Sequence, residues 1–348
     1  MKIYNKVKNL LIFLVYYFFS IIVFFSIYIS KLRKENILYT DDFGFGDYLI
    51  YCVEVRNQLN HKTKIFCYSK LQNEIANFFF EKKYIVNSFI LLPRFMNESY
   101  LGYQILIWKE FFKPKKLTRS VGDNIKAPVS HIHNGTNDSI KFIKKRIKSS
   151  TISRNIVKIL KKPTLCIFIK NFSKNSNNHM NFQIRQTRDL NKINRLLHFL
   201  NTKKINVIIL GKNKDHFIQL ITNFIKKAKF KNIFLFKDLS DNYSICDQAY
   251  TAQNSIGYIG SASGAMDFNG LLNKKIILID HVFTSFDKYR TKNFKFLYKK
   301  MYDRKNKITQ KVNWGVFYNT KRYKIVETKF ADIKKVLIRR ILKKTLIK

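Results

Sequence analysis

The sequence predicts an α/β protein with two Rossmann-like, doubly wound parallel sheets, preceded by one membrane-spanning helix. Short apolar runs alternate with helical stretches from residue 36 to residue 280, with one interruption. Such alternation is the pattern of βαβ units. An uncharged apolar segment, residues 10–29, precedes them. The chain is 46% hydrophobic and 15% aromatic, which excludes a disordered protein and supplies material for two cores.

The apolar segment 10–29 is long enough to cross a bilayer as a helix, at about 1.5 Å per residue. Cleaved signal peptides have a shorter apolar region and end at small residues. Here the segment runs into Ser30-Lys31-Leu32-Arg33-Lys34. We therefore expect residues 1–34 to form a retained anchor. Basic residues flank the segment on both sides, so they do not indicate its orientation.

Residues 35–150 are predicted to form the first sheet domain. Strands are expected at 36–40, 64–68, 89–92 and 103–108, with helices at 48–59 and 71–82. The stretch 109–162 contains two prolines and a basic helical segment, which indicate a linker with a bridging helix. His131 and His133 lie in it without the further ligands that a metal needs, so we predict no metal site.

Residues 151–348 are predicted to form the second sheet domain. Strands are expected at 164–170, 206–210, 232–236, 255–260 and 275–280, and helices at 190–200, 214–227, 244–253 and 265–272. The tail 331–348 places apolar residues on one helical face and basic residues on the other. Such a helix either lies on an anionic membrane or packs across the domain, and the pattern leaves both open. The apolar positions are Ile333, Leu337, Ile341 and Leu342.

The chain carries a net charge of +44, which indicates a phosphate-rich partner, either nucleic acid or an anionic membrane. It has no helix-turn-helix signature, zinc-finger spacing or RNA-binding strand pair, and its basic residues are spread from end to end. We therefore predict anionic membrane lipids and no nucleic acid as partners. The cysteines form no CxxC pair and lie in apolar runs, as buried thiols of a reducing compartment do. They are Cys52, Cys67, Cys166 and Cys246.

The loop after the first predicted strand is the first candidate site, because ligands of open α/β sheets lie beyond the carboxyl ends of strands. Gly44 and Gly46 allow a ligand to approach the backbone closely. Asp47 begins the following helix, where a carboxylate is either a cap or a general base. The sequence leaves both interpretations open.

Two further candidates lie in the second domain. The strand 255–260 is followed by Ser261-Ala262-Ser263-Gly264-Ala265-Met266-Asp267, small residues at a helix start that suit a diphosphate. This run is neither a P-loop nor a G-x-G-x-x-G fingerprint. A long loop after Lys170 carries Arg185 and Arg188, whose guanidinium groups match phosphate. We predict that both segments contact an anionic ligand.

The order of these elements resembles that of GT-B glycosyltransferases, in which two Rossmann-like domains face a cleft, and in particular the heptosyltransferase-like and fucosyltransferase-like groups. Gly46-Asp47 matches the Gly-Asp that follows the first strand of heptosyltransferases. Ser263-Gly264 matches the Ser-Gly of their D-S-G-x-x-H donor run, although Ala262 and Asp267 replace its Asp and His. A group of uncharacterised bacterial glycosyltransferase-like proteins is also similar to residues 165–211, through Lys170, Arg185, Arg188 and Gly211.

The resemblance implies a glycosyltransferase of hexosyl or heptosyl type that moves a sugar from a nucleotide-sugar donor to a glycan or glycolipid in cell-envelope polysaccharide synthesis, such as that of lipopolysaccharide. It implies that the first domain, residues 35–150, receives the acceptor, with Asp47 as the base, and that the second domain, residues 151–348, binds the nucleotide sugar. It also implies donor binding by the other candidate residues, Asp267 included. We expect no cofactor and no metal. The expected location is the bacterial inner membrane, single-pass, with a cytoplasmic catalytic domain. A non-catalytic basic protein that binds anionic lipid or polysaccharide at the membrane surface remains the alternative.

Overall fold

The computed structural model describes residues 36–38, 63–67, 70–87, 136–171, 186–212, 215–240, 244–284, 287, 292–313 and 322–343, parts of a helix between 48 and 56, and single positions between 14 and 33. The chain divides into two units, residues 1–127 and residues 128–348. The sequence analysis placed this division at residue 150, so the expected bridging helix falls in the second unit.

The first unit contains a parallel sheet in the order β1 (Asn36–Leu38), β2 (Thr63–Cys67), β3 (Ile85–Asn87). Helix α3 (Lys70–Phe79) and the short η1 (Lys82–Tyr84) join β2 to β3. The Tyr48 hydroxyl lies 3.4 Å from the Cys67 thiol and links the helix at 48–56 to β2. The predicted strands at 89–92 and 103–108 lie outside the described residues.

The second unit is built on a six-stranded parallel sheet in the order β6-β5-β4-β7-β8-β9. Its first strand is central, the next two lie on one side and the last three on the other, which is the doubly wound arrangement. The strands are β4 (Thr164–Phe168), β5 (Asn206–Ile209), β6 (Ile233–Leu235), β7 (Gly257–Gly260), β8 (Ile276–His281) and β9 (Phe294–Tyr298). This confirms the predicted second sheet and adds β9.

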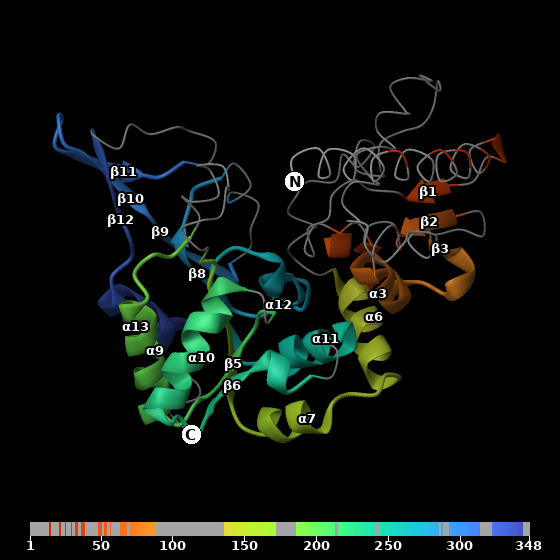
Figure 1. Cartoon of the computed structure of the whole chain (residues 1–348), viewed down its shortest axis with the longest axis horizontal. Helices are drawn as coiled ribbons and strands as arrows, with labels where there is room; N and C mark the ends of the chain where they lie inside the picture. The colour runs from red at the N-terminus through yellow and green to blue at the C-terminus, as the bar shows by residue number, and fades with distance from the viewer. Residues whose placement is uncertain are drawn as a thin grey trace, which may run out of the picture. The chain divides into compact units, whose positions relative to one another are not determined.

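Helices cover both faces of this sheet (Figure 1). Alternate strand residues point to opposite faces, so Leu165 and Ile167 pack in one core and Cys166 in the other. The first core includes α9 (Asn191–Thr202), α10 (His216–Ala228), α13 (Phe330–Leu337) and its π-helical extension η8 (Ile338–Leu342). On the other side lie α7 (Arg154–Leu160), α11 (Ile245–Asn254), η4 (Phe236–Asp238) and η6 (Gly264–Met266). Helix α6 (Asn137–Lys148) contacts α11, as does α12 (Asp267–Leu271).

The C-terminal helix packs into the first core. Its apolar stripe is buried beside α9, while Lys334 and Arg339 on the opposite face are exposed. The stripe consists of Ile333, Leu337, Ile341 and Leu342. Of the two interpretations that the sequence left open, the helix packed across the domain is confirmed.

A small antiparallel sheet extends from the end of β9 and was not predicted. Its order is β11-β10-β12, with β10 (Lys300–Asp303), β11 (Ile308–Lys311) and β12 (Tyr323–Val326). Only Lys299 separates β9 from β10. Figure 1 shows these strands projecting beyond β9, at the upper left of the second unit.

The predicted membrane span, residues 10–29, lies mostly outside the described residues. In the part of the chain that the structure describes, no helix combines the length and the apolar character needed to cross a bilayer. The predicted single-pass location in the inner membrane is therefore corrected, and membrane anchoring does not enter the function proposed below.

All four cysteines carry free thiols. Cys52, Cys67 and Cys166 are buried and Cys246 is half-buried. Burial raises the pKa of Cys67 and of Cys166 to about 12, so these thiols stay protonated. The prediction that the cysteines are buried is confirmed for Cys52, Cys67 and Cys166.

Candidate functional site

The carboxyl ends of β4 and β7 form the centre of the candidate site. These strands are neighbours in the sheet, but β4 leads to α9 on one face and β7 leads to η6 on the other. Doubly wound sheets bind ligands at such a switch point, because the chain departs in opposite directions there. The residues that leave β4 and β7 are therefore the candidates for ligand contact.

The two strand ends are joined by Ser261. Its hydroxyl accepts a hydrogen bond from the Lys170 amide at 2.9 Å, and its own amide donates to the Phe168 carbonyl at 2.8 Å. The Tyr258 hydroxyl donates to the Ser261 carbonyl at 2.8 Å. Gly260 has φ +154°, and a Cβ there would lie 1.9 Å from the Phe168 oxygen. The glycine is required for this close strand approach.

The chain after Ser261 presents small residues at the same edge. Ser263 has extended backbone and leads into η6, which begins at Gly264; both residues are half-buried. The Ser263 hydroxyl oxygen is buried and has no hydrogen-bond partner among the described residues. Buried hydroxyls are normally hydrogen-bonded, so this oxygen is suited to a ligand. Asp267, the first residue of α12, is 5% exposed.

The end of the arginine-bearing loop crosses this edge. The Thr187 amide donates to the Lys170 carbonyl at 2.8 Å, and the Thr187 hydroxyl donates to the Asp280 carboxylate at 2.8 Å. Lys170 follows β4 and Asp280 lies at the end of β8, with β7 between these strands. The loop therefore passes the carboxyl end of β7. Arg188, which is exposed, comes next in the chain.

A buried charge network fixes the position of this loop. The Lys192 ammonium lies 2.6 Å from an Asp280 oxygen and 2.7 Å from a Glu327 oxygen. The Lys299 ammonium lies 3.4 Å from the other Glu327 oxygen and donates to the Gln186 carbonyl at 2.5 Å. All four charged side chains are at most 14% exposed. The two lysines balance the two carboxylates, so the network carries no net charge.

Glu327 also holds the loop backbone directly. Its carboxylate accepts hydrogen bonds from the amides of Arg188 at 2.7 Å and Asp189 at 3.0 Å. Burial acts to raise the pKa of Glu327, but attraction to Lys299 and hydrogen bonds from Lys192 and the Arg188 amide bring that pKa below its ordinary value. Burial lowers the pKa of Lys299, against its attraction to Glu327. The carboxylate is thus ionised where it binds the loop.

The structure brings most of the predicted donor-site residues to one edge of the second sheet: Lys170, Arg188, Ser261, Ser263, Gly264 and Asp267. Gly211, which follows β5 at the same carboxyl edge, has φ +137°, and a Cβ there would lie 2.7 Å from Ile218 of α10. Gly44, Gly46, Asp47 and Arg185 lie outside the described residues. Within the described ranges, no group of three or more His, Cys, Asp or Glu residues could hold a metal ion.

The sequence analysis missed the charge network. One sequence feature could have indicated Asp280, because it lies at the end of an apolar strand, and carboxyl ends of strands carry ligand or network residues. No sequence feature indicated the pair of Lys192 and Glu327, which are 135 residues apart in the chain.

No family model matches the sequence, and no curated protein matches it. Solved structures that share some likeness include the ADP-heptose lipopolysaccharide heptosyltransferase II of Escherichia coli, at 10% identity and a TM-score of 0.38, over 86% of this chain and 82% of that one. Another is the E. coli heptosyltransferase WaaC with ADP, at 10% identity and a TM-score of 0.30, over 71% of this chain and 70% of that one.

Proposed function

We propose that this protein is a glycosyltransferase of the GT-B type, which moves a sugar from a nucleotide-sugar donor to a hydroxyl of a glycan or glycolipid in cell-envelope polysaccharide synthesis. The observation that supports this best is the edge between β4 and β7. There the switch point of a doubly wound sheet carries small residues, a buried hydroxyl at Ser263 and the exposed Arg188. The Gly46-Asp47 and Ser263-Gly264 motifs support the same reaction by resemblance.

The chemistry of this edge suits a diphosphate. Gly264 leaves room beside the backbone, the Ser263 hydroxyl can donate to a phosphate oxygen, and Arg188 supplies positive charge. The nearby carboxylates of Asp280 and Glu327 do not repel an anion, since Lys192 and Lys299 balance them. The network therefore places no net negative charge beside an anionic ligand.

In the proposed reaction, the acceptor hydroxyl oxygen attacks the anomeric carbon of the donor as the bond from that carbon to the diphosphate breaks. The hydroxyl proton passes to Asp47, the base that the resemblance implies. Lys170 and Arg188 stabilise the negative charge on the departing diphosphate. Asp267 orients a donor hydroxyl, and no step uses a metal ion.

Thermal shift of the full-length chain with a panel of nucleoside diphosphates tests the donor site. We expect one nucleotide to raise the unfolding temperature. Gly264→Val should remove that shift, because a branched side chain occupies the diphosphate position. Arg188→Ala should weaken binding by about 1.5–3 kcal/mol, the contribution of a charge-assisted hydrogen bond.

Arg154→Ala, which removes an exposed arginine from α7, is the matched control and should leave nucleotide affinity unchanged. A chain that responds to no nucleotide, or equal losses in Arg188→Ala and Arg154→Ala, would contradict the proposed donor site.

A further inference from the structure

The small antiparallel sheet gathers lysines on one face. In its register, Lys300 lies directly opposite Lys311, and Tyr302 lies directly opposite Lys324. Directly opposed residues share a face of an antiparallel sheet, and so do alternate residues of one strand. We call this the lysine face, and it consists of Lys300, Tyr302, Thr309, Lys311, Lys324 and Val326.

The opposite face of the small sheet is occupied by other contacts. Met301 and Ile325 pack there with Val282 and Val312. Asp303, the one acidic residue of the three strands, also lies on that face. A bidentate hydrogen bond from Arg322 lowers the pKa of Asp303 to about 2, and turn amides bind the same carboxylate. The lysine face therefore contains no acidic residue that could balance its charge.

The lysine face is uncovered and electrostatically unfavourable by itself. Every residue of β11 is exposed, as are Lys300 and Lys324. Like charges directly opposite one another destabilise a sheet, and Lys300 faces Lys311. The β10–β11 turn adds the exposed Arg304, Lys305 and Lys307. An anion bound across the strands would relieve this repulsion.

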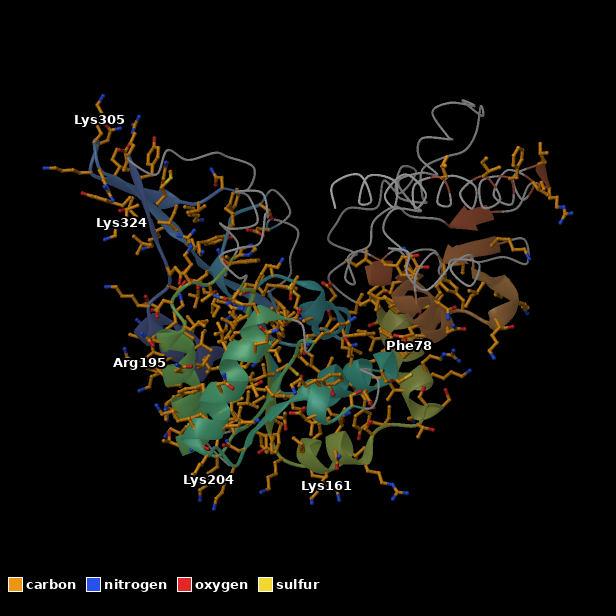
Figure 2. All side chains as sticks on the ribbon, viewed as in Figure 1. Phe78, Lys161, Arg195, Lys204, Lys305 and Lys324 are labelled. Atoms are coloured by element: carbon orange, nitrogen blue, oxygen red, sulfur yellow. The ribbon has the colours of Figure 1, made fainter. Side chains whose placement is uncertain are left out.

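The lysine face is continuous with the edge that carries the candidate site. Parallel strand β9 ends at that carboxyl edge and passes through Lys299, a member of the charge network, into β10. The Lys311 ammonium lies 4.5 Å from the centre of the Tyr298 ring at the end of β9. Figure 2 shows Lys305 and Lys324 on the projecting sheet, at the opposite end of the second unit from Lys161 and Lys204.

We propose that the lysine face binds an anionic glycan, whose acidic groups contact Lys300, Lys311 and Lys324 and whose sugar rings contact Tyr302. That the anion is a glycan rests on the glycosyltransferase function proposed above, because such an enzyme binds a glycan as its substrate. Three strands of four residues offer a surface of about 13 Å by 10 Å, the size of a short oligosaccharide.

The test compares two triple variants of the full-length chain that carry the same net charge. One is Lys300→Gln/Lys311→Gln/Lys324→Gln. The control is Lys161→Gln/Lys204→Gln/Lys226→Gln, which removes three exposed lysines. Figure 2 shows Lys161 and Lys204 at the end of the second unit opposite the small sheet, and Lys226 lies in the last turn of α10. The probe is a labelled heparin hexasaccharide, measured by fluorescence anisotropy at low salt, beside its desulfated form and a single-stranded oligonucleotide of equal charge.

We expect the variant of the lysine face to lose about tenfold in affinity for the hexasaccharide, the sum of three exposed ion pairs, with a shallower salt dependence. The control variant should bind like the parent chain, and the desulfated sugar should not bind. The unfolding temperature of the first variant should not fall, since the change removes repulsion. Equal losses in both variants would refute a specific site, and tighter binding of the oligonucleotide through the same lysines would refute a glycan.

Nucleotide thermal shifts on the same proteins separate this inference from the proposed function. The variant of the lysine face should keep the nucleotide response of the parent chain. In one outcome the parent chain binds no nucleotide but binds the hexasaccharide, and the variant of the lysine face loses that binding. The proposed transferase function then fails and the glycan site stands.

Discussion

Glu327→Gln tests whether the buried charge network holds the arginine-bearing loop in place. Glutamine has nearly the same shape, so the change removes one negative charge and leaves Lys192 and Lys299 with Asp280 alone. It also leaves one acceptor oxygen for two loop amides. Removing one partner of a buried ion pair costs about 3–5 kcal/mol. Because the Glu327 side chain is 14% exposed, water relieves part of this, and we expect a loss of about 2–3 kcal/mol.

Hydrogen–deuterium exchange of peptides covering residues 186–192 measures this loss directly. A loss of about 2–3 kcal/mol corresponds to roughly 30- to 150-fold faster exchange of the Arg188 and Asp189 amides. Asp332→Asn, which neutralises an exposed carboxylate in the first turn of α13, is the control and should leave that exchange unchanged. Unchanged exchange in Glu327→Gln would refute the role of the network.

The pH dependence of the same exchange gives an independent check. The folded-state pKa of Glu327 lies below its ordinary value, so its stabilisation is complete above the unfolded carboxyl pKa of about 4.3. It is lost as the pH falls through the lower folded-state pKa. The measured quantity is the protection factor of the loop amides, in which the base-catalysed intrinsic rate is divided out, and we expect it to fall as the pH drops below about 4.3. A protection factor that decreases as the pH rises from 5 to 7 would contradict this sign.

Three other variants test the fold and the reaction. Gly260→Ala places a Cβ against the Phe168 carbonyl at a φ of +154° and should destabilise the second unit by about 3 kcal/mol, seen as a lower urea midpoint; an unchanged midpoint would show that the strands can separate there. Leu337→Ala opens a cavity where α13 packs and should cost about 2–5 kcal/mol; a loss below 1 kcal/mol would contradict its place in the core. Asp47→Asn should lower glycosyl transfer about 10²- to 10⁴-fold with nucleotide binding intact, and near-normal turnover would exclude it as the base.

The second sheet was predictable from sequence because each of its central strands is an unbroken apolar run. The expected strand 206–210 corresponds to β5, and the expected helix 244–253 to α11, within one residue at either end. Strands buried on both faces have this composition whatever surrounds them. The boundaries therefore depend on local sequence and could be placed.

The small sheet and the charge network depend on distant residues and could not be placed in the same way. Phe294, Lys295 and Phe296 alternate at the start of β9, a short period-2 signal that could have indicated this strand, whereas β10 has no such run. The partners of Lys192 and Lys299 are set by tertiary structure, because β8 carries Asp280 in the six-stranded sheet and Glu327 follows β12 of the small sheet. Sequence indicated Arg188 as a candidate, but not what holds its backbone.

The packing of α13 has a consequence for how the second unit folds. This helix lies against α9 and β8, so its core joins segments well over a hundred residues apart in sequence (Figure 1). Such long-range contacts impose a large loop-closure entropy before they add any stability, which makes folding slow. Until α13 docks, the part of the sheet face beside β8 that α9 and α10 do not cover remains open to water. Partly folded chains should therefore depend on chaperones at that face, and their tendency to aggregate should decline only once residues 330–342 have packed.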